Sequence, residues 1–83
     1  MDINYEYYKV FYYVGKYRNL TKAAQALGSN QPNVTRVMKL LESELGCQLL
    51  VRSSKGIALT EKGALLHERV SSAFFSFRRQ RRS

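Results

Sequence analysis

The sequence contains little cysteine, little acidic charge and no long apolar run. Cys47 is the only cysteine, which excludes a disulfide within the chain and a zinc site built from several cysteines, and fits a reducing, cytoplasmic setting. No apolar stretch approaches the roughly 18 to 20 residues of a membrane-spanning helix. Asp2 and Glu6 stand where a signal peptide would be basic and then apolar. We therefore expect one small domain that neither enters a membrane nor is exported.

The shortage of acidic residues leaves the chain basic. It has 14 lysines and arginines against 6 aspartates and glutamates, a formal net charge of +8. Four of the basic residues lie at the C-terminal end, so the rest of the chain carries 10 against 6. A polyanion is the natural partner class for such a chain. We interpret the terminal arginines as a solvated end, with a nonspecific nucleic-acid tail or a membrane-surface element as alternatives.

The sequence also lacks the groupings that catalysis requires. It has no paired nucleophile and base, no cluster of metal-ligating side chains and no glycine-rich phosphate loop. We predict that the chain is not an enzyme and uses no cofactor or metal. His67 has no partner histidine or carboxylate cluster, so we expect it on a helix surface or in a dimer contact. Cys47 is interpreted as a small buried side chain.

Helical spacing of large residues predicts a first helix over residues 5–15. Its apolar face, expected in the core, is Tyr5, Tyr8, Phe11 and Tyr12. This leaves Tyr7, Tyr13 and Tyr17 as surface candidates for stacking on single-stranded bases. Asn19 then offers the N-cap of a short second helix that ends before Gly28.

A third helix follows the tight turn at residues 28–30. Asn30 caps it, Pro32 fits its first turn, and Gly46 is placed to end it. We interpret Pro32 mainly as a helix starter, with contact to a thymine methyl as the alternative. The inward face is predicted to be Val34, Met38, Leu41 and Leu45.

After Gly46 the period changes to that of strands. Residues 49–52 and 57–59, around a turn at residues 53–56, predict one β-hairpin. Thr60 caps a fourth helix with an apolar stripe of Leu66, Val70, Ala73, Phe74 and Phe77. The stripe is longer than so small a domain needs, so we favour a dimer seam of Leu66, Val70, Phe74 and Phe77 over ordinary core.

The second and third helices, joined by a short glycine-containing turn, predict a helix-turn-helix that presents the start of the third helix to the DNA major groove. Amide side chains grip adenine edges, arginine grips guanine, and threonine serves a base or a phosphate. The expected base readers are Gln31, Pro32, Asn33, Thr35 and Arg36. The hairpin would reach the neighbouring backbone or minor groove as a wing. Phosphate or wing contacts are expected from Thr21, Lys22, Lys39, Arg52, Ser53 and Lys55.

Four motifs in this order and spacing resemble the N-terminal domain of LysR-type transcriptional regulators. They are a Thr-x-Ala-Ala pair, a Gln-Pro before the reading helix, a Leu-Glu-x-x-Leu-Gly exit and a Leu-Thr-x-x-Gly start of the last helix, all within residues 20–63. The resemblance, which spans about residues 5–80, implies a mainly α winged helix-turn-helix over residues 1–60. It also implies a linker and dimerisation helix with a basic tail over residues 61–83.

The resemblance further implies a homodimer that reads an operator in double-stranded DNA. A small-molecule effector would bind only through a further domain, which we expect to be absent from this chain. Departures from the family pattern lie on the third helix. Val37 and Leu40 replace residues that are often polar, which removes expected phosphate contacts from its outer face. Asn33 is either an extra base reader or a solvated first-turn residue.

Two other function classes stay open from the sequence. A nonspecific RNA or single-strand binder would use the charge and the tyrosines without reading bases. A pure dimerisation module would self-associate through the last helix without binding DNA in a salt-dependent way. A sequence-specific reader of duplex DNA fits the ordered motifs best.

Overall fold

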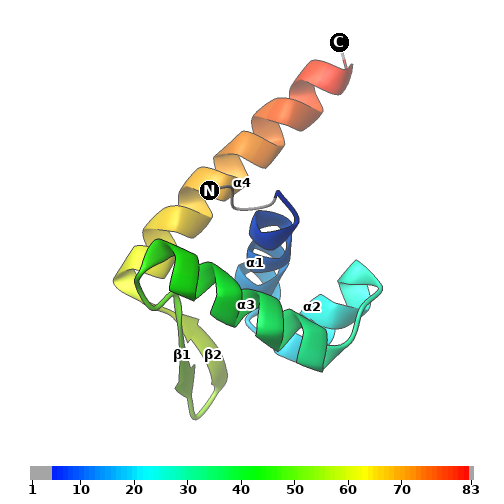
Figure 1. Ribbon diagram of the computed structural model, residues 1–83. Helices are drawn as coiled ribbons and strands as arrows, with labels where there is room; N and C mark the ends of the chain where they lie inside the picture. The colour runs from blue at the N-terminus through cyan, green and yellow to red at the C-terminus, as the bar shows by residue number, and fades with distance from the viewer. Residues whose placement is uncertain (1–4, 83) are drawn as a thin grey trace.

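Four helices and one hairpin make up the fold of the computed structural model, which describes residues 5–82 and the side chains of residues 5–74. In chain order the elements are α1 (Tyr5–Tyr17), α2 (Leu20–Leu27), α3 (Gln31–Leu45), β1 (Leu50–Ser53), β2 (Gly56–Leu59) and α4 (Glu61–Arg82). Helices α1, α2 and α3 pack together, the hairpin projects from the end of α3, and α4 runs away past α1 (Figure 1). This arrangement confirms the predicted winged helix-turn-helix.

The predicted caps lie at the helix ends where the sequence placed them. Asn19 Oδ1 accepts a hydrogen bond from the Lys22 backbone N–H at 2.9 Å, and Asn30 Oδ1 accepts one from the Asn33 N–H at 2.9 Å. Each bond satisfies a donor that the first helical turn leaves unpaired. Gly46 ends α3 in the left-handed region, with φ of 72°. A glycine stops the helix there without the strain that a Cβ would bring.

Apolar residues of the first three helices and Leu49 form the core. The buried set from α3 is Val34, Val37, Met38 and Leu41. The prediction for Leu45 was therefore wrong, because this residue lies in the last turn of α3 and is 37% exposed. The outward placement of Val37 was also wrong. Val37 follows Val34 by three residues and precedes Leu41 by four, which puts it on the same buried face.

The tyrosines of α1 divide differently from the prediction. Tyr5, expected in the core, is 63% exposed. Tyr7 and Tyr13, expected on the surface, are half-buried and pack against the core. Tyr8 is also half-buried against the core, while Tyr17 is exposed as expected. The helix therefore buries a wider face than one stripe, and its tyrosines do not make an open platform for stacking bases.

The hairpin is held at its base by the side chain of Glu42 on α3 and by that of Thr60, the residue before α4. Its antiparallel register runs from Leu50↔Leu59 to Ser53↔Gly56, so the ladder is one residue longer at the turn than the prediction allowed. Glu42 Oε2, from α3, accepts hydrogen bonds from the backbone N–H groups of Leu49 and Leu50 at 2.7 and 3.1 Å. The Thr60 hydroxyl donates to the Gln48 carbonyl at 2.7 Å and accepts from the Gly63 N–H at 3.0 Å, which confirms Thr60 as the cap of α4.

Helix α4 packs on α1 through an aromatic cluster. The His67 ring stacks on Tyr12, with centroids 5.5 Å apart, and meets the edge of Phe11 at 5.6 Å. His67 Nε2 lies 3.0 Å from the Tyr12 carbonyl oxygen, which accepts its N–H. A Cβ at Gly15 would collide with this ring. The sequence placed His67 on a surface or in a dimer contact, and this was wrong because α1 leaves a glycine-sized space for it.

Three residues of the stripe on α4, Leu66, Val70 and Phe74, pack within the chain, whereas Ala73 is exposed. Val70 is 8% exposed, Leu66 packs against the core, and the Phe74 ring lies 5.8 Å from that of Tyr5 and 4.9 Å from that of Tyr12. Leu66, Val70 and Phe74 therefore have partners within the chain, which the preference for a dimer seam over ordinary core did not anticipate. The Phe77 side chain lies outside the described residues.

Candidate nucleic-acid interface

The outer face of α3 is polar and open, because the opposite face forms the core. Gln31, Pro32 and Arg36 are exposed, and Thr35 is half-buried beside them. With Lys39 and Leu40 they line one shallow surface along the helix. The helix begins at Gln31, so the unpaired backbone N–H groups and the positive end of the helix dipole lie beside these side chains. This surface brings together four of the five predicted base readers.

The fifth, Asn33, is half-buried and its side chain is engaged. Its Oδ1 accepts a hydrogen bond from Arg36 Nη2 at 2.7 Å, and its Nδ2 donates to Ser29 Oγ at 3.0 Å. Gln31 has a looser contact, because its Oε1 accepts from the Thr21 hydroxyl at 3.4 Å. The turn between α2 and α3 and the start of α3 are thus connected by side-chain hydrogen bonds.

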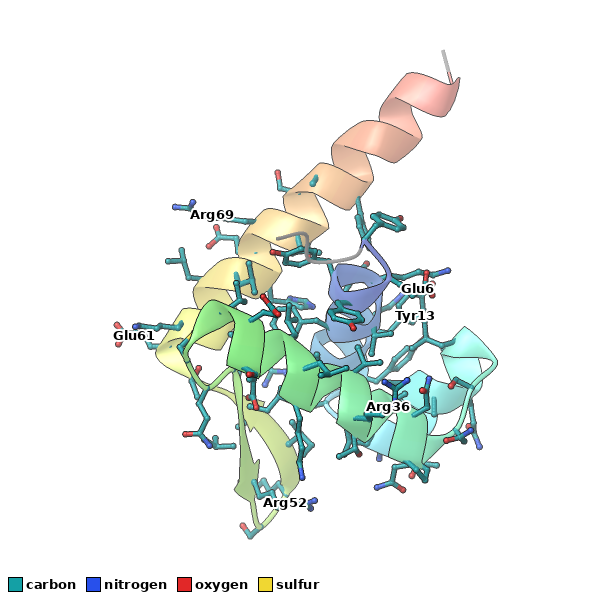
Figure 2. All side chains as sticks on the ribbon, viewed as in Figure 1. Glu6, Tyr13, Arg36, Arg52, Glu61 and Arg69 are labelled. Carbon is teal, nitrogen blue, oxygen red and sulfur yellow. The ribbon has the colours of Figure 1, made fainter. Side chains whose placement is uncertain are left out.

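A groove separates α3 from the hairpin. Thr35, Lys39 and Glu42 line one wall, and Leu50, Val51 and Arg52 line the other. Arg36 and Arg52 lie on these two separate elements, the helix and the hairpin (Figure 2). Lys39 on the helix wall and Arg52 on the hairpin wall place a cationic side chain on each side of the groove. The Glu42 carboxylate also lines this groove, and one of its oxygens accepts hydrogen bonds from the backbone N–H groups of Leu49 and Leu50.

The remaining predicted contacts lie on the hairpin and on α2. Arg52, Ser53 and Lys55 are exposed on the hairpin, and Thr21 and Lys22 are exposed in the first turn of α2. The Ser53 hydroxyl donates to the Gly56 carbonyl at 3.3 Å and accepts from the Lys55 N–H at 3.3 Å. Ser53 therefore shapes the turn that carries Lys55.

Sequence reasoning missed the residue that holds the hairpin against α3. In the sequence, Glu42 stands out only as part of the Leu-Glu-x-x-Leu-Gly motif, which indicates no role for its carboxylate. Its carboxylate lies seven residues before Leu49 and accepts the backbone N–H of that residue. That N–H needs an acceptor because Leu49 is buried. Periodicity does not show this, since the contact joins a side chain to a backbone.

Residues 5–64 match the family model described as bacterial regulatory helix-turn-helix protein, lysR family. The chain belongs to the LysR family. It is 41% identical over 61 residues to a probable cat1 operon transcriptional activator of Acinetobacter lwoffii, covering 74% of this chain and 20% of that protein. It is 40% identical over 62 residues to the HTH-type transcriptional regulator BudR of Klebsiella aerogenes, covering 75% and 43%. This LysR-family chain thus spans less than half the length of these relatives.

Solved structures of the LysR family share the fold. The chain in the CbnR DBD–DNA complex matches with a TM-score of 0.82 and 35% identity, over 94% of this chain and 90% of that one. The chain in the BenM DBD/catB site 1 DNA complex matches with a TM-score of 0.87 and 28% identity, over 94% and 87%. The family is one of regulators, not of enzymes. Among the residues that the structure describes, no helix is long and apolar enough to cross a membrane.

Proposed function

We propose that this chain is the operator-reading part of a LysR-type transcriptional regulator. The observation that carries the proposal is the outer face of α3, which exposes amide, hydroxyl and guanidinium groups at a helix start while its other face is core. Such a helix fits the DNA major groove and reads base edges there. The structures of the CbnR and BenM DNA complexes support the proposal, because the protein chains in them share this fold.

In the proposed complex, Gln31, Thr35 and Arg36 contact base edges. The hairpin contacts the adjacent backbone or minor groove through Arg52 and Lys55. Phosphates are bound by Thr21, Lys22 and Lys39. Pro32 begins the helix and offers its ring to a thymine methyl. The groove between α3 and the hairpin accepts the sugar-phosphate backbone that separates the two DNA grooves.

The proposed assembly is a homodimer that binds an inverted repeat. Two features support it. Leu65 is 53% exposed on α4, on the side opposite the residues that pack on α1, and α4 extends well past α1 (Figure 1). Pairing two copies through this uncovered face buries the same patch on each chain and directs both α3 helices to one side of the duplex.

Selection from random duplexes tests the proposal. We expect enrichment of one motif with inverted symmetry, with half-sites about one helical turn apart. Binding should weaken steeply with salt, as phosphate contacts require. A flat preference across duplexes, or tighter binding to single strands than to any duplex, would contradict base reading by α3.

A further inference from the structure

Asn33 lies among the side chains proposed to read DNA, but the oxygen and the nitrogen of its side-chain amide are both hydrogen-bonded within the chain. Its backbone N–H bonds to the cap Asn30 at 2.9 Å, its Oδ1 accepts from Arg36 at 2.7 Å, and its Nδ2 donates to Ser29 at 3.0 Å. The orientation of the amide follows from chemistry. Arginine has only donors, so the atom that faces it must be the oxygen, and the nitrogen then faces the serine hydroxyl.

These bonds join the turn before α3 to a guanidinium one turn along the helix. Arg36 is exposed, and a free arginine side chain samples many rotamers, which must be ordered when it grips a base. Asn33 is half-buried, so its side chain is more ordered than the water molecules that would otherwise bind the Arg36 guanidinium. Its bond to Nη2 uses one of five donors and leaves enough for the two that a guanine edge requires.

We propose that Asn33 is a positioning residue that orients Arg36 toward a guanine, and that it does not itself read a base. The inference rests on the proposed function, since it takes Arg36 to be a base reader. Because Asn33 holds Arg36 in the free protein, the entropy cost of ordering the Arg36 side chain is met during folding and not during DNA binding. Asn33 therefore contributes to the preference for guanine, while the overall attraction to DNA comes from the phosphate contacts.

The experiment uses the site obtained from random duplexes. The base pair read by Arg36 is the one at which Arg36→Ala loses preference, and its guanine is replaced by 7-deazaguanine, which lacks the N7 acceptor. We expect Asn33→Ala to reduce the preference for guanine over 7-deazaguanine about three- to tenfold, the effect of one hydrogen bond to a charged group at an exposed site. In an Arg36→Ala background, Asn33→Ala should have no further effect on this ratio.

Three variants separate positioning from structural damage. Asn33→Asp keeps the acceptor, so the guanine preference should persist while affinity falls on all duplexes, because the new charge repels phosphates. Ser29→Ala removes the far anchor and should reduce the preference less than Asn33→Ala. Ser43→Ala, an exposed change elsewhere on α3, should leave it unchanged. Thermal unfolding of Asn33→Ala should stay close to that of the unmutated chain, because the cap uses the backbone N–H.

The outcomes distinguish the two proposals. If Arg36→Ala abolishes the guanine preference but Asn33→Ala leaves it intact, the positioning role is wrong and the proposed function stands. If Asn33→Ala instead relaxes preference at a different base pair, Asn33 reads DNA directly and the inference is overturned. If Arg36→Ala changes no preference, the reading role of Arg36 fails, and the inference fails with it.

Discussion

Gly15 occupies an unusual position for a glycine, since it is buried in the interior of α1. Alanine would normally stabilise such a helix by about 1 kcal/mol. Here a Cβ would collide with the His67 imidazole. We expect Gly15→Ala to lower the free energy of unfolding by about 1–3 kcal/mol, the usual effect of overpacking a core. Urea denaturation of the single and double variants measures it.

The matched control is His67→Ala, which makes room for the added methyl group. In that background Gly15→Ala should be neutral or stabilising instead of destabilising. The effects of the two substitutions on the free energy of unfolding should therefore not add. A Gly15→Ala variant more stable than the unmutated chain would show that α4 does not seat His67 against α1.

Gln31 and Lys22 make different predicted contributions at the same helix-turn-helix. Gln31 is exposed at the start of α3, where its amide faces a base edge in the proposed complex. We expect Gln31→Ala to relax preference at particular base pairs and to weaken binding to the best site by about 1–3 kcal/mol. Lys22→Ala should weaken all duplexes alike and reduce the salt slope by about one. Equal weakening of every duplex by Gln31→Ala would mean that α3 does not read bases there.

At the scale of elements, the hairpin depends on α3 for its position. Glu42 accepts the N–H groups of Leu49 and Leu50, so its removal leaves two backbone donors without their acceptor. We expect Glu42→Ala to lower the free energy of unfolding by about 1–3 kcal/mol. Amide hydrogen exchange at Leu49 and Leu50 should become faster. Glu42→Gln keeps a carbonyl acceptor and should lose less, whereas equal losses in the two variants would point to the charge instead of the hydrogen bonds.

At the scale of the whole molecule, α4 has an inner face and an outer face. Leu66, Val70 and Phe74 pack inside the chain, and Leu65 is exposed on the other side. We expect Leu65→Asp to convert a two-to-one complex on an inverted repeat into a one-to-one complex, because it puts a charge in the proposed seam. The thermal stability of the monomer should be unchanged. Sedimentation of the complex measures the first effect and circular dichroism the second.

Phe74→Asp is the contrasting variant. Its ring contacts Tyr5 and Tyr12 of the same chain, so the substitution should lower the unfolding temperature of the monomer. A Leu65→Asp variant that still binds as two chains per site would place the dimer contact elsewhere than on this part of α4.

Features that depend on neighbours along the chain could be predicted from the sequence. Asn19 and Asn30 cap helices through bonds to residues three positions away, and Gly46 stops α3 through its own backbone conformation. Hydrophobic spacing and these caps were enough to place four helices, one hairpin and the polar opening of α3. Their physical basis is local, so no knowledge of distant contacts was needed.

Which helix faces meet depends on contacts between distant parts of the chain, so it could not be predicted from spacing. His67 finds its partners on α1, 55 residues away from Tyr12, and nothing in the spacing around either residue indicates that the glycine at position 15 makes room for the ring. Leu66, Val70 and Phe74 pack within the chain on the same helix. The link between Asn33 and Arg36 depends on side-chain rotamers and on Ser29 beside them. Periodicity places residues on a face, but packing and hydrogen-bond geometry decide which groups on that face are held and which remain free to bind.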